Sequence, residues 1–66
     1  MKLEIQKIIV DVYHETVSES FARKVSPLAA HKEGVTAAAM LLAAMTGAED
    51  EAAKKAVVAL GLRPTV

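Results

Sequence analysis

Cysteine is absent from this chain of 66 residues, and aromatic residues, glycine and proline are scarce. Without cysteine the chain forms neither a disulfide nor a thiolate zinc site, so two common supports of a small fold are excluded. The aromatic residues are Tyr13 and Phe21 alone. The apolar content is therefore alanine and aliphatic side chains, and because alanine and leucine favour helices, the composition predicts an all-α chain.

An excess of charge of one sign is also missing, because eight basic residues balance eight acidic ones. No third of the chain is strongly basic, so the composition does not indicate binding to phosphate groups. The longest weakly polar run, residues 35–48, is shorter than the roughly 20 residues that a membrane helix needs. Glu4 and Gln6 interrupt the basic-then-apolar pattern of a signal peptide. We therefore expect a cytoplasmic protein that does not contact a membrane.

The length predicts one helical domain over residues 1–66. A domain of this size buries only about 60% of the surface that its unfolded chain exposes, so its stability alone is marginal. With disulfides excluded, association is the remaining common way to bury more surface. We therefore expect the chain to pair with itself, as a homodimer or higher oligomer, or with another protein.

The first predicted helix covers residues of about 3–25. Apolar residues recur along it at spacings of three and four, and Ile5, Ile9 and Val12 widen the stripe toward one side. Pro27 ends the helix near Ser26. Because residues 8–12 are mostly β-branched, a strand over residues 2–10 is the alternative. As a helix, this segment would be about 34 Å long, and it would then extend beyond the rest of so small a domain.

The second predicted helix covers residues of about 27–46. Ser26 is a good N-cap and Pro27 a good first helical residue. Apolar residues from Leu28 to Met45 keep one heptad register, which favours a single helix, with a bend at Gly34. In the alternative, a short helix ends near Lys32, and Gly34 caps it.

The third predicted helix covers residues of about 48–60. Thr46 and Glu49 have the spacing of a capping box, and Gly61 is placed to end the helix with Leu62 packing back on Val57. Gly47 can either cap the second helix or lie inside the start of the third. The resulting fold class is all-α: a small three-helix bundle, made of a long hairpin and a short third helix, and completed by oligomerisation.

The predicted contact with a partner uses the stripe of the first helix and the seam of the second. Helices that present an apolar stripe bury it against another element. The interface residues are expected to be Ile9, Val10, Tyr13, Val17, Phe21, Leu28, Val35, Leu42 and Met45.

Asp11, His14 and Glu15 share one helical face and have a spacing that helical metal sites use. A metal-binding helical dimer that uses these three residues is therefore a remote alternative. A solvated polar face is much the commoner explanation of such a cluster, and we assign no metal and no cofactor. His31 lies on the seam of the second helix, where it is either a packed, hydrogen-bonded residue or a functional group.

No serine or threonine lies in a nucleophile motif, and there is no glycine-rich phosphate loop. We therefore expect no enzymatic activity. The predicted function is a small protein-interaction or regulatory module, such as an adaptor, an inhibitor or an assembly factor. The alternative is a DNA-binding regulator or antitoxin, either of helix-turn-helix type over residues 42–60 or of ribbon-helix-helix type. The helix-turn-helix type is disfavoured because its second helix would begin with Glu49, Asp50 and Glu51, and these acidic side chains would face phosphates.

Overall fold

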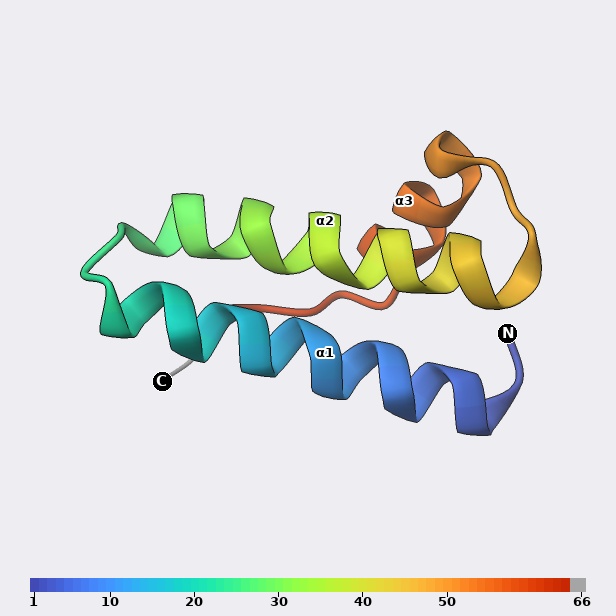
Figure 1. The fold of residues 1–66 in the computed structure, drawn as a ribbon, viewed down its shortest axis with the longest axis horizontal. Coiled ribbons are helices and arrows are strands. Elements are labelled where there is room, and N and C mark those ends of the chain that lie inside the picture. Colours follow the sequence, from blue (N-terminus) through green and yellow to red (C-terminus); the bar gives the residue numbers. More distant parts are fainter. Residues whose placement is uncertain (65–66) are drawn as a thin grey trace.

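The computed structural model describes residues 1–64, and these form three helices and no strand. The order is α1 (Leu3–Ala22), α2 (Pro27–Thr46) and α3 (Asp50–Ala59). α1 and α2 run antiparallel as a hairpin, and α3 lies against the second half of α2 (Figure 1). The all-helical prediction is therefore confirmed for this part of the chain. None of its helices combines the length and the apolar character that crossing a bilayer requires.

The first helix ends at Ala22, earlier than the predicted Val25. Lys24 adopts a left-handed backbone conformation with φ of 63°, and the amide of Val25 donates to the carbonyl of Ser20 at 3.2 Å. This local turn ends the helix before Pro27 takes effect. The first half of α1 is also helical, from Leu3 onward, so the alternative of a strand over residues 2–10 is wrong.

The second helix begins as its sequence predicts. The Ser26 hydroxyl accepts a hydrogen bond from the amide of Ala29 at 3.2 Å, and Pro27 is the first helical residue. The helix continues through Gly34 to Thr46, so the alternative of two short helices is wrong. It ends at Gly47, whose φ of 74° is the left-handed conformation that glycine adopts at little cost.

The third helix begins without the predicted capping box. Its N-cap is Glu49, whose side chain makes no capping hydrogen bond. The hydroxyl of Thr46 instead donates to the carbonyl of Leu42 at 2.8 Å and accepts from the amide of Ala48 at 3.3 Å. The other end is close to the prediction, because Gly61 has φ of 69° and Leu62 packs against the core.

The core lies mainly between α1 and α2, which have the same length of 20 residues. The expected overhang of α1 is therefore not found, because α2 runs along all of it (Figure 1). Ile9, Tyr13 and Val17 of α1 are fully buried. Facing them are buried residues of α2, while Ala53 and Val57 supply the contribution of α3.

Gly34 lies where α2 meets the ring of Tyr13. A Cβ atom at this position would lie 2.7 Å from Cδ2 of Tyr13 and 2.9 Å from Cγ2 of Val17. Real Cβ atoms do not approach other atoms this closely, so only glycine fits without displacing its neighbours. Gly34 is therefore a packing residue in a continuous helix. The close approach of α2 to the ring of Tyr13 requires glycine at this position, although glycine is less favourable in a helix than alanine.

Candidate interaction surface

Five of the nine predicted interface residues lie in the core of the single chain. Ile9, Tyr13 and Val17 have no exposed surface, and Val35 and Leu42 are 5% and 4% exposed. The reason is that α2 covers the apolar stripe of α1, and α1 and α3 cover the seam of α2. In this conformation these five side chains are not offered to a partner.

The other four predicted interface residues keep some surface. Val10 and Phe21 are half-buried on α1. Leu28 and Met45, near the two ends of α2, are 65% and 42% exposed. Phe21 and Leu28 lie near the turn of the hairpin and Met45 near its open end, so the four do not form one patch by themselves.

Asp11, His14 and Glu15 are all exposed on α1. Within residues 1–64, no group of three or more acidic, histidine or cysteine side chains is arranged to hold a metal ion. The ring of His14 lies edge-on to Tyr13, with ring centroids 5.2 Å apart. The structure thus shows a solvated polar face on this side of α1.

His31 forms a hydrogen bond with the buried hydroxyl of Tyr13. Its Nδ1 lies 2.7 Å from the hydroxyl of Tyr13, and the two rings are edge-on with centroids 5.7 Å apart. Burial raises the pKa of the Tyr13 hydroxyl above its usual value, because ionisation would place a charge in the core. The histidine therefore satisfies a buried polar group, which is one of the two roles expected for it.

A polar network joins the two helices near the turn of the hairpin. Ser20, fully buried, donates to a carboxylate oxygen of Glu33 at 2.6 Å. The guanidinium of Arg23 donates to the other oxygen of Glu33 at 3.0 Å and to the Ser20 hydroxyl at 3.3 Å. The hydrogen bonds from Ser20 and Arg23 lower the pKa of Glu33. The arginine at the end of α1 thus pairs with a carboxylate of α2.

This network fixes which residues share a side of the hairpin. Ile5 precedes Arg23 by eighteen residues, which is five full turns of an α-helix. Ala44 follows Glu33 by eleven residues, which is close to three turns. Because Arg23 and Glu33 meet on one side of the hairpin, Ile5 and Ala44 lie on that same side, toward its open end.

We name this apolar surface the open face. Its residues lie at helical spacing around Ile5 and Ala44: Ile5, Ile8 and Val12 on α1, and Ala37, Met40, Leu41 and Ala44 on α2. Ile8 is 43% exposed and Met40 is 67% exposed. In Figure 1, α3 lies beside the second half of α2, on the side of α2 away from α1. Met40 lines a hollow with Asp50, Glu51 and Lys54 of α3, so the open face borders the third helix at this residue.

The open face was not among the predicted interface residues, although its signal is present in the sequence. Ile5 and Val12 widen the apolar stripe of α1 beyond the width that one neighbouring helix covers. A broad stripe of this kind indicates contacts on two sides. The sequence does not say which part of the stripe α2 covers.

Comparison with protein-family models, with curated proteins and with solved structures found no match to this chain.

Proposed function

We propose that this protein is a small, non-enzymatic protein-interaction module that self-associates through the open face. The observation that carries the proposal is a side of the hairpin with exposed Ile8 and Met40 beside half-buried Ile5, Val12 and Leu41. In a domain this small, an uncovered apolar side forgoes a large share of the burial that stabilises the fold. A regulatory role as an adaptor, inhibitor or assembly factor would be exercised through such contacts.

The size of the surface suits a second copy of the chain. The molecule measures 33 × 21 × 18 Å, and the hairpin occupies most of its broad side. A surface of these dimensions approaches the roughly 800 Å² per partner of a standard protein interface. The small side chains of Ala37 and Ala44 allow another helix to approach α2 closely.

The net charge does not oppose association. The formal net charge is zero, so two copies experience little overall repulsion. Glu15 and Glu19 are exposed on the same side of α1, three and seven residues after Val12, so they would stand at the rim of the contact. The charged pair of Arg23 with Glu33 on that side is already formed within the chain.

The ribbon-helix-helix form of the DNA-binding alternative requires a strand at the N-terminus, and residues 3–22 form a helix instead. In the helix-turn-helix form, the second helix would be α3, which starts with exposed Asp50 and Glu51. Acidic side chains there would repel phosphates. The geometry therefore favours protein contacts over DNA contacts.

The test is the molar mass in solution by size-exclusion chromatography with light scattering. The wild-type chain should have the mass of two or more copies. Ile8→Glu and Met40→Glu should weaken association at least about thirtyfold, because a charge enters an apolar contact. In a two-fold dimer each substitution acts twice. Both residues are exposed in the single chain, so the variants should keep their helical circular dichroism.

Leu28→Glu is the matched control, because Leu28 is as exposed as Met40 but lies outside the open face. It should leave the mass unchanged. If Leu28→Glu dissociates the assembly while Ile8→Glu does not, the interface lies elsewhere. A wild-type chain that stays monomeric at high micromolar concentration would remove the proposal.

A further inference from the structure

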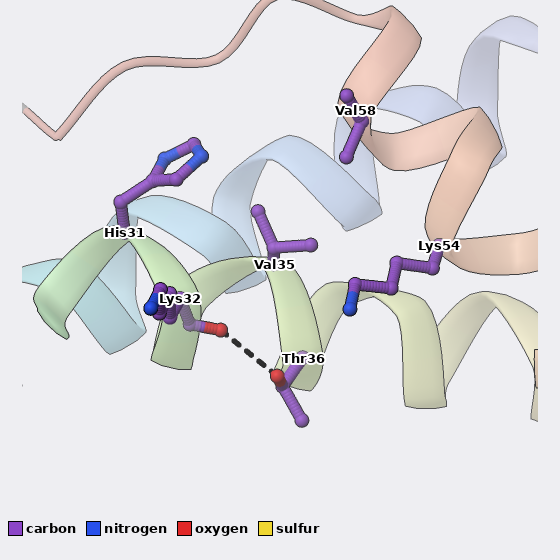
Figure 2. A pocket seen from close by; sticks show the side chains of 6 residues that line it. All are labelled: His31, Lys32, Val35, Thr36, Lys54 and Val58. Atoms are coloured by element: carbon purple, nitrogen blue, oxygen red, sulfur yellow. Dashed lines mark hydrogen bonds between the residues drawn. The ribbon is translucent and has the colours of Figure 1, made fainter. Parts of the chain in front are cut away.

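A hollow lies between α2 and α3. It has a volume of about 460 Å³ and is lined by His31, Lys32, Val35, Thr36, Lys54 and Val58. Figure 2 shows Val35 and Val58 pointing toward each other across it, while the Lys54 side chain extends from α3 toward Thr36. The hollow therefore has an apolar middle and charged side chains at its rim.

A second hollow of about 260 Å³ continues the first. It shares His31, Val35 and Val58 with it and extends to Leu62 and Arg63 in the segment after α3. Because three lining residues are common to both, we treat them as one feature, the α2–α3 groove. Its combined size is within the range of small-molecule sites.

The charge of the groove differs from that of the whole chain. The chain has as many acidic as basic residues, yet Lys32, Lys54 and Arg63 line the groove, and no carboxylate is among its lining residues. Asp50 and Glu51 line adjoining hollows that share Lys54 with the groove. Its floor is apolar, since Val35 is 5% exposed and Val57 1% exposed. A site with this lining favours a molecule that has a negative group and an apolar body.

His31 joins this site to the core. Its Nδ1 lies 2.7 Å from the Tyr13 hydroxyl, and the tautomer of the ring decides which of the two donates. The ring stands at the edge of the groove beside Val35 (Figure 2).

We propose that the α2–α3 groove binds an organic anion with an apolar chain, of the medium-chain carboxylate class. The carboxylate would lie at the rim near Lys32 and Lys54, and its chain would cover Val35 and Val58. The groove adjoins the open face at one edge, because Thr36 and Lys54 also line a hollow with Met40.

The test is a titration of the full chain with decanoate, followed by two-dimensional amide NMR. The largest shifts should fall on residues around Val35, Lys54 and Val58. Lys32→Gln and Lys54→Gln should each weaken binding about fivefold, and both lysines are exposed, so the fold should not change. Lys7→Gln is the control, since Lys7 is an exposed lysine of α1 and lines neither hollow of the groove.

Two comparison compounds separate the contribution of the negative charge to binding from that of the apolar chain. Decyltrimethylammonium has the same chain with a positive group, and acetate has the negative group with no chain. Both should bind at least tenfold more weakly than decanoate. Equal binding of decyltrimethylammonium or of acetate would overturn the proposal, as would decanoate shifts confined to the open face or an equal loss of binding in Lys7→Gln.

Discussion

α2 packs against α1 and against α3, and the two contacts differ in how completely side chains fill the space between the helices. Toward α1, a glycine lies against an aromatic ring, and Ile9, Tyr13 and Val17 have no exposed surface. Toward α3, a hollow of about 460 Å³ remains, and Val58 is 57% exposed. One helix thus makes a tight contact and a loose contact within the same small domain.

The difference follows from length and from side-chain size. α1 and α2 are 20 residues each, whereas α3 has 10 residues and buries only Ala53 and Val57. A short helix with small buried residues cannot fill the space beside α2. The stability of this chain should therefore depend mostly on the α1–α2 contact, while the α2–α3 contact leaves room for a ligand.

The largest expected effect comes from Gly34→Val, which would break the tight contact. Its first added carbon already lies within 2.7–2.9 Å of Tyr13 and Val17. Overfilling a packed core costs about 1–3 kcal/mol, and here we expect about 3 kcal/mol less free energy of unfolding in a urea titration. The better helix propensity of valine returns only part of this.

Ala29→Val is the control for this substitution, because Ala29 is on the same helix but only half-buried. We expect its free energy of unfolding to lie within about 0.5 kcal/mol of the wild type. If Gly34→Val is as stable as Ala29→Val, the ring of Tyr13 does not lie against α2 as the structure has it.

A smaller effect is expected at the loose contact from Val57→Ala. Val57 is 1% exposed, so the substitution removes two buried carbon atoms. We expect a loss of about 1–2 kcal/mol, measured by the same urea titration. Val58→Ala, at an exposed site on the same helix, should change stability much less. A cost at Val57 above that of Gly34→Val would reverse the comparison of the two contacts.

The smallest effect is expected from Tyr13→Phe, which keeps the ring and removes its hydroxyl. The hydrogen bond to His31 is lost, and a loss of about 1 kcal/mol is typical of one buried hydrogen bond. A stability equal to that of the wild type would show that water replaces this bond in the folded chain.

The raised pKa of Tyr13 also predicts how the free energy of unfolding changes with pH in the alkaline range. Its pKa is raised in the folded chain, so the folded state holds the proton more tightly than the unfolded state. The resulting stability is complete below the usual tyrosine pKa of about 10 and is lost as the pH rises through the higher folded value. Tyr13 is the only tyrosine, so its absorbance at about 295 nm follows this titration, and Tyr13→Phe should flatten that part of the pH profile.

The features that could be predicted from the sequence are the local ones. Helical periodicity predicted three helices in the observed order. Ser26 and Pro27 predicted the start of α2, and Gly61 predicted the end of α3, because each acts through its own backbone neighbours. Periodicity also identified the apolar stripe of α1.

The features that could not be predicted depend on contacts between distant residues. Gly34 suggested a bend, but its role is set by the ring of Tyr13, 21 positions earlier in the sequence. Arg23 and Glu33 pair across the hairpin, although Glu19 was nearer in sequence. An apolar stripe also does not reveal whether its cover is the same chain or a partner, which is why buried Ile9 and Val17 were assigned to an interface.

The arrangement of contacts has a consequence for how fast the chain folds. The main helix contacts join neighbours in sequence, α1 with α2 and α2 with α3. Such a topology has a low contact order, because little chain must be closed into a loop before each contact forms. We therefore expect folding on the microsecond-to-millisecond scale that is typical of helical bundles, with the tightly packed hairpin as its nucleus and α3 docking last.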